Sequence, residues 1–182
     1  MEIFEIILIG IGLSMDAVAV SMSNGMVYKN IEKDKTLAMP IFFGVFQGMM
    51  PLLGFFAGSL FSDFISKYSG MVTLIVLGII GGKMIKDGLS PEDEGEENAT
   101  SLTYKVLFLQ AIATSIDAFA VGVSFCAAGT NIFLSAPIIA VTTLICSAIA
   151  VYIGKRFGNL LGDKAQILGG IILVIIGIKA IL

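Results

Sequence analysis

The sequence predicts an all-α membrane protein of six transmembrane helices, arranged as two inverted-topology three-helix repeats. Three observations lead to this class. Of the 182 residues, 57% are hydrophobic and 14% are charged, whereas a soluble domain typically carries about a quarter charged residues. Six apolar stretches follow one another along the chain, and one motif occurs once in each half. The lipid bilayer is therefore the expected solvent.

Each apolar stretch approaches the roughly 20 residues that a membrane-spanning helix needs. In chain order we expect spans at Ile3–Val27, Leu37–Phe61, Ser69–Lys86, Leu102–Ala127, Ile132–Ile153 and Ala165–Leu182. The first span is not a cleavable signal, because its leading residues Glu2 and Glu5 are acidic and Asp16 lies at its middle.

One long polar segment divides the chain. It carries the run Pro-Glu-Asp-Glu-Gly-Glu-Glu at 91–97, which is too charged to be anything but a solvated linker. We expect a first three-helix repeat at residues 1–88, an acidic cytoplasmic linker at 89–101 and a second three-helix repeat at 102–182.

The two halves share sequence patterns. The motif S-x-D-A-x-A-V-x-x-S occurs at 14–23 and at 115–124, and I-G-x-K-x-I ends the third span at 80–85 and the sixth at 176–181. Because three spans are an odd number, the second half must enter the bilayer upside down relative to the first. This inverted repeat is typical of secondary transporters, whose substrate site lies near the midplane.

Positive charges predict the orientation, since cytoplasmic loops are enriched in Lys and Arg. The loops after the first, third and fifth spans hold nine of the eleven: Lys29, Lys33, Lys35, Lys83, Lys86, Lys105, Lys155, Arg156 and Lys164. Both termini are therefore expected outside the cytoplasm. Lys83 and Lys179 lie at span ends, where snorkelling anchors are favoured over an ion pair with a membrane aspartate.

Asp16 and Asp117 occupy equivalent places in the repeated motif. Each carboxylate at a helix centre costs about 2.5–3.5 kcal/mol on insertion scales. A purely structural clamp is disfavoured, because Asn would serve it at lower cost. We therefore expect a shared divalent cation site. Without the ion, two close carboxylates would hold at least one proton, so metal binding would release protons and metal/proton exchange is the expected coupling.

Helix spacing supplies further candidate ligands. Ser23 lies seven residues after Asp16 and Ser124 seven after Asp117, close to two helical turns, and Asn24 is near the same face. Gln47 in the second span and Thr143 in the fifth occupy equivalent repeat positions. Gln47 is interpreted either as a ligand or as an amide bonding across helices, and for Thr143 a hydroxyl bond to its own helix is favoured.

The second span also contains helix-perturbing residues. Pro51 lacks an N–H and leaves the carbonyl of Gln47 without its helical partner, and Gly48 and Gly54 make a local break easier. The pairs Gly44/Gly48 and Gly54/Gly58 also have the small-xxx-small spacing that allows close helix packing.

Composition excludes several kinds of chemistry. The chain has no His, the commonest ligand for zinc and copper, so an all-oxygen site indicates Mg, Ca or Mn. A net charge of −3 without a basic patch excludes nucleic acid as a partner. Cys126 and Cys146 lack CxxC spacing and are expected to pack. No cofactor and no enzymatic activity are expected.

Four motifs together resemble the bacterial manganese efflux pump family of the MntP type, within the lysine exporter superfamily. They are S-M-D-A at 14–17, F-F-G-x-F-Q-x-x-M-P-L-L-G at 42–54, G-G-K-M-I at 81–85 and S-I-D-A-F-A-V-G at 115–122. The resemblance implies export of Mn²⁺ across the plasma membrane, with Asp16 and Asp117 at the centre of the transport site. Gln47 and the motif glycines are implied supporters.

Alternative classes explain the residues less well. An exporter of another divalent cation fits the same site. An amino-acid exporter would need a group to receive a carboxylate, and no span contains Arg. An intramembrane aspartyl protease also uses two membrane aspartates, but its Tyr-Asp and Gly-x-Gly-Asp patterns are missing. The expected partners are Mn²⁺, H⁺ and the lipid bilayer, and the oligomeric state stays open.

Overall fold

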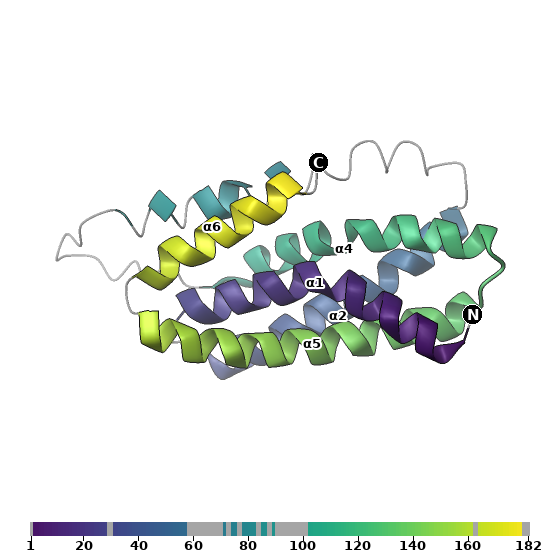
Figure 1. Cartoon of the computed structure of the whole chain (residues 1–182), viewed down its shortest axis with the longest axis horizontal. Coiled ribbons are helices and arrows are strands. Elements are labelled where there is room, and N and C mark those ends of the chain that lie inside the picture. Colours follow the sequence, from purple (N-terminus) through teal and green to yellow (C-terminus); the bar gives the residue numbers. More distant parts are fainter. Residues whose placement is uncertain are drawn as a thin grey trace.

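The computed structural model describes residues 2–28, 31–57, 102–161 and 164–179, with residues 71, 74–75, 78–82, 85–86 and 89 between them. In this part of the chain the regular structure is entirely helical (Figure 1): α1 Ile3–Val27, α2 Lys33–Ala57, α4 Tyr104–Ala127, α5 Ile132–Leu161 and α6 Lys164–Lys179. The all-α class is confirmed. Eight of the eighteen residues of the third expected span, and the linker from residue 90 to 101, lie outside the described residues.

Within the part of the chain that the structure describes, four helices are long and apolar enough to cross a membrane: Ile3–Val27, Lys33–Ala57, Tyr104–Cys126 and Ile132–Phe157. Helix α6, described over 16 residues, is shorter than the roughly 20 residues of a full span. The length and composition of these helices therefore identify the chain as a multi-pass membrane protein.

Two details of the expected helices are wrong. Helix α5 continues to Leu161, so Lys155 and Arg156 belong to a helix and not to a loop. Lys155 Nζ donates a hydrogen bond to Thr36 Oγ1 at 2.8 Å, which ties the extra turns of α5 to the start of α2. Helix α2 also stays helical through Pro51 to Ala57, so the break that Gly48 and Gly54 would make easier is not there.

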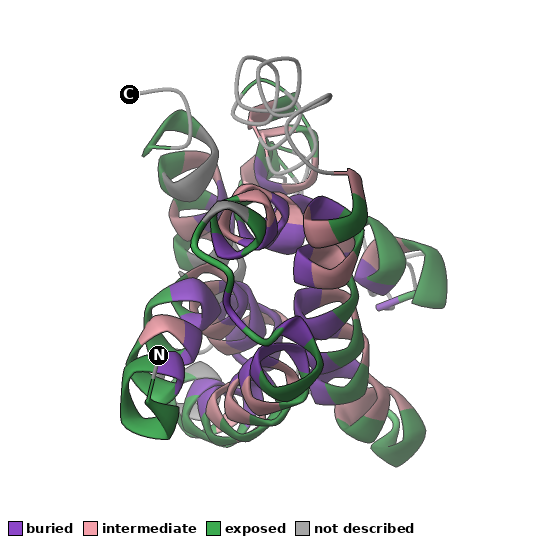
Figure 2. Cartoon of the chain, turned by 90° about the vertical axis from the view of Figure 1, so that its right-hand side faces the viewer, coloured by how far each residue is buried: buried purple, intermediate pink, exposed green. Residues whose placement is uncertain are grey.

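The helices pack mainly across the two halves of the chain. Helix α1 packs on α5, while α2 packs on both α4 and α5; α1 and α2 touch each other only slightly. Figure 1 shows α1 and α5 running in one direction, with α2 and α4 running in the opposite one. In the end-on view of Figure 2, the buried faces of these helices turn toward one another.

Glycines allow the closest helix crossings. On α2 and α4, a Cβ at Gly54 would collide with the carbonyl oxygen of Phe119, and one at Gly122 with that of Pro51. The backbones therefore touch directly, which no larger residue permits.

The α1/α5 crossing repeats this arrangement. A Cβ at Gly154 would collide with the carbonyl oxygen of Met22, and one at Gly25 with that of Val151. The pattern is the same at both crossings. On each helix, the residue whose carbonyl oxygen lies against the glycine of the other helix comes three positions before that helix's own glycine. Gly44 and Gly48 similarly pack against Ala140 of α5, which confirms the small-residue contact expected for this pair.

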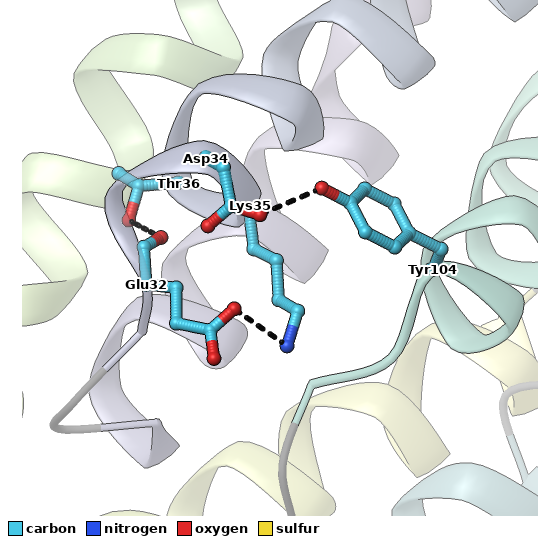
Figure 3. A network of polar contacts seen from close by, with 5 residues as sticks. All are labelled: Glu32, Asp34, Lys35, Thr36 and Tyr104. Carbon is cyan, nitrogen blue, oxygen red and sulfur yellow. Dashed lines mark hydrogen bonds and ion pairs between the residues drawn. The ribbon is translucent and has the colours of Figure 1, made fainter.

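One end of the bundle carries most of the described cations. At this lysine-bearing end, where α1 and α5 finish and α2 and α4 begin, lie Lys33, Lys35, Lys105, Lys155 and Arg156. Figure 3 shows the polar contacts there: Tyr104 Oη donates to Asp34 Oδ2 at 2.8 Å, and Lys35 Nζ lies 3.0 Å from Glu32 Oε2.

Candidate metal site

Asp16 and Asp117 lie near the middle of α1 and α4. Their carboxyl groups interact electrostatically across the two helices. The Asp16 side chain is half-buried and that of Asp117 is exposed. The two carboxyl groups therefore lie midway along their helices, within electrostatic range of each other.

A second contact fixes how α1 and α4 are aligned. Asn24 on α1 pairs with Gln110 on α4 through their side-chain amides. Asp16 precedes Asn24 by eight residues, and Asp117 follows Gln110 by seven. Both pairs fit one antiparallel register, so the aspartates meet because the two helices cross in opposite directions.

Gln47 reaches the level of the aspartates from α2. Its Nε2 donates a 2.9 Å hydrogen bond to the carbonyl oxygen of Leu13 on α1, three residues before Asp16. The amide therefore does bond across helices. Among the described residues, its fully buried Oε1 has no hydrogen-bond partner, which leaves this oxygen free to accept a cation.

Helix α5 approaches the same level from the other side. Gly10 of α1 lies against Thr142 of α5, and Gly25 lies against Val151. Asp16 stands between the two glycines on α1. The middle of α5 is therefore level with Asp16.

Thr143 and Ser147 in that middle part of α5 are fully buried. Within the described structure neither hydroxyl has a hydrogen-bond partner. The favoured interpretation, that Thr143 bonds to its own helix, is wrong; the neighbouring Thr142 does so instead, donating to the carbonyl oxygen of Ile138 at 2.8 Å. Thr143 Oγ1 and Ser147 Oγ are thus additional unpaired oxygens level with the aspartates.

Ser23 and Ser124 flank the aspartate pair. Seven residues of helix rise about 10 Å, whereas two oxygens bound to one Mg²⁺- or Ca²⁺-sized ion lie within roughly 5 Å of each other. Ser23 is buried and unpaired among the described residues, while Ser124 is exposed and donates to the carbonyl oxygen of Ala120. Neither completes the ligand shell of an ion held by Asp16 and Asp117.

Asn24 is also removed from the aspartates. It lies eight residues, about 12 Å of helix rise, from Asp16, and Gln110 occupies its amide. Gln110 was missed in the sequence because it precedes the repeated motif. Its only signal is that it is an uncharged polar residue inside an apolar span.

Lys179, at the end of α6, interacts electrostatically with Asp16. Helix α6 packs on α1, which brings this exposed ammonium toward the aspartate. The snorkelling interpretation is therefore incomplete for Lys179. Its repeat counterpart Lys83 lies outside the described residues.

The side chains at this level offer hard oxygen ligands. No group of three or more His, Cys, Asp or Glu side chains occurs in the described part of the chain. The available set is two carboxylates with neutral amide and hydroxyl oxygens, which suits Mg²⁺, Ca²⁺ or Mn²⁺ rather than copper or zinc.

The fold and these residues together define a class: multi-pass helical membrane proteins with acidic residues midway along membrane-spanning helices. Ionisable residues inside membrane helices mark ion or substrate pathways.

Comparison with known proteins gives the family. The family model described as "Putative manganese efflux pump" matches residues 30–181, and the chain belongs to this manganese efflux pump family. A relative of that description, MntP of Ruminiclostridium cellulolyticum, is 48% identical over 98% of this chain and 95% of its own length. MntP of Methanosphaera stadtmanae is 41% identical over 98% of both chains. MntP of Campylobacter hominis is 45% identical over 98% of this chain and 96% of its own.

No solved structure shows a significant match to the chain.

Proposed function

We propose that this protein exports Mn²⁺ from the cytoplasm across the plasma membrane in exchange for protons. The ion binds between Asp16 and Asp117, with Gln47 Oε1 and Thr143 Oγ1 as neutral ligands. The observation that carries the proposal is the electrostatic interaction of two carboxyl groups placed midway along α1 and α4 in a chain of the manganese efflux family. The neutral ligands are supported by their burial and their lack of other partners among the described residues.

An inverted repeat of two three-helix units explains the packing. If α1 corresponds to α4 and α2 to α5, the α1/α5 contact is the counterpart of the α4/α2 contact. These are two of the major helix pairs, and both use the reciprocal glycine crossing. Such a repeat permits alternating access, in which the two halves rock about a fixed central site.

The lysine-bearing end faces the cytoplasm in this proposal, because Lys and Arg concentrate on that side of membrane proteins. Both termini then lie outside. Mn²⁺ enters the site from the lysine-bearing end and displaces protons that neutralise the carboxylates. Protons from outside replace the ion after its release. The empty site therefore turns back toward the cytoplasm without an uncompensated pair of negative charges.

The test is Mn²⁺ flux in vesicles reconstituted with purified protein. Asp16→Asn and Asp117→Asn should each lower the flux at least about tenfold, the effect of losing about 1.4 kcal/mol of binding. Asp34→Asn removes an exposed carboxylate at the lysine-bearing end and should leave the flux near that of the unmodified protein. Folded Asn variants that still carry Mn²⁺ would remove the two-carboxylate site, and flux that ignores an imposed pH gradient would remove the proton coupling.

A further inference from the structure

A polar contact outside the aspartate level joins the two halves of the chain. Asn24 Nδ2 donates to Gln110 Oε1 at 2.8 Å, and Gln110 Nε2 donates back to Asn24 Oδ1 at 3.2 Å. The Sδ atom of Met39 on α2 lies 3.8 Å from Asn24 Nδ2. All three side chains have 0% exposed surface. We call Asn24 and Gln110 the amide pair.

The amide pair lies on one side of the aspartates. Going along α1 from Asp16 toward the lysine-bearing end, Asn24 comes about 12 Å later. Gln110 precedes Asp117 on α4, which begins at that same end. The amide pair therefore lies between the aspartates and the lysine-bearing end.

At the equivalent place on the opposite side, the residues that the structure describes make no such polar contact. By the repeat, Phe125 corresponds to Asn24 and Ile9 to Gln110. Both are apolar and belong to one hydrophobic cluster, in which Phe125 is 4% exposed. The amide pair is thus a feature of one end alone and not a requirement of the repeated helix crossing.

The side chains on the two sides of the aspartates also differ in how deeply they are buried. Ser23 and Ser124 are repeat counterparts, each two turns beyond its aspartate. Ser23, on the side of the amide pair, has 0% exposed surface, whereas Ser124 is exposed, as is Asp117 on the same face of α4. Ser23, on the side of the amide pair, is therefore more deeply buried than its counterpart on the opposite side.

We propose that the amide pair is the inner gate of the exporter, closed in this structure, and that the ion leaves along the α4 face that bears Asp117 and Ser124. This inference rests on the proposed export function. Neutral amides suit a gate, because each exchanges its partner amide for water without a change of charge. When they separate, their oxygens line the path of a cation, which an apolar contact does not offer.

Thiol labelling tests which side is open. In a chain with Cys126→Ser and Cys146→Ser, Ser124→Cys and Ser23→Cys form a matched pair of single cysteines. A membrane-impermeant maleimide added outside intact cells should label Ser124→Cys roughly tenfold or more faster than Ser23→Cys, because buried positions react only after local opening. Equal rates, or faster labelling of Ser23→Cys, would overturn the proposal.

Cross-linking tests the gate itself. In the same background, Asn24→Cys with Gln110→Cys can be joined by a short bifunctional methanethiosulfonate, since two cysteines are shorter than the amides that they replace. The joined protein should still bind Mn²⁺ in detergent but lose vesicle flux, and reductant should restore the flux. Asn24→Cys alone offers the reagent no second cysteine to join, so its own flux should be the same before and after the treatment. Mass spectrometry verifies that cross-linking is complete. Undiminished Mn²⁺ flux in the fully cross-linked protein would overturn the proposal that the amide pair is a gate.

The outcomes separate the gate from the function. If the cysteine-free chain carries no Mn²⁺, the proposed export fails, but the labelling contrast needs no metal and still tests the closed side. If that chain carries Mn²⁺ and the joined protein does as well, export stands and only the inner gate fails.

Discussion

Two adjacent threonines on α5, Thr142 and Thr143, differ in whether their hydroxyls have a hydrogen-bond partner. Thr142 donates to its own helix, while the buried Thr143 Oγ1 has no partner among the described residues. An unpaired buried hydroxyl costs folding free energy, so retaining one at the level of Asp16 favours a role in binding.

Thr143→Val should therefore weaken Mn²⁺ binding without destabilising the protein. We expect a Kd increase of roughly tenfold, the loss of about 1.4 kcal/mol, with an unchanged or slightly higher melting temperature. Thr142→Val, the matched control, should keep the Kd. Calorimetric titration of purified protein and thermal unfolding in one detergent measure both quantities. Equal Kd values for the two variants would exclude Thr143 as a ligand.

In the proposed site, a metal ion at Asp16 has the positive charge of Lys179 as a neighbour. Its ammonium interacts with Asp16, so a cation bound there meets a like charge. Lys179→Gln should tighten Mn²⁺ binding roughly three- to tenfold, the size of a Coulomb interaction of about 1 kcal/mol. Lys179→Arg should bind as the unmodified protein does. Lys105→Gln, on an exposed Lys at the start of α4, is the control, and weaker binding by Lys179→Gln would contradict the opposing role.

The repeated motif points to the aspartates of the proposed site but not to the amide pair. Asp16 and Asp117 could be paired because identical neighbours surround them, and Gln47 and Thr143 because the repeat aligns their helices. Asn24 and Gln110 meet only when α1 and α4 cross in an antiparallel register, and their repeat counterparts are apolar. No periodicity in the sequence therefore signals that contact.

At the scale of the helices, close crossings decide the architecture. The apolar stretches predicted where helices lie, but the ends moved where tertiary contacts extended them: α5 continues through Gly154 because that glycine meets α1 and Lys155 bonds Thr36. A single sequence shows such contacts only as glycines inside apolar runs, without saying which helix each one meets.

Adding a methyl group to a glycine at a helix crossing should therefore destabilise the protein strongly. Gly54→Ala and Gly154→Ala each push a Cβ into a carbonyl oxygen of the facing helix, and we expect a loss of about 1–3 kcal/mol or more in stability. Gly12→Ala is the matched control, because nothing lies within 4 Å of a Cβ there, and it should be neutral or slightly stabilising. Melting temperatures in one detergent, with membrane levels, measure the difference; a Gly54→Ala melting curve equal to that of Gly12→Ala would contradict the direct backbone contact.

At the scale of the whole molecule, the two halves form one packing unit. The sequence divides at the acidic segment, yet α1 packs on α5 and α2 on α4 and α5, while α1 and α2 barely touch. Composition locates a boundary in the chain, but it does not reveal whether the halves pack separately. Here the buried faces of the first half are covered mostly by the second.

Separating the halves should therefore abolish export, and supplying both together should restore it. Residues 1–88 or 102–182 expressed alone leave the α1/α5 and α2/α4 faces without their partners, so each fragment should be degraded or inactive. Co-expressed fragments can form the same crossings, because no described contact that builds the aspartate site needs the linker. Cellular Mn²⁺ content in a manganese-sensitive host, with fragment levels from blots, measures the result. Full export by either half alone would contradict a site shared between Asp16 and Asp117, and stable co-expressed halves without export would assign the linker a role in transport.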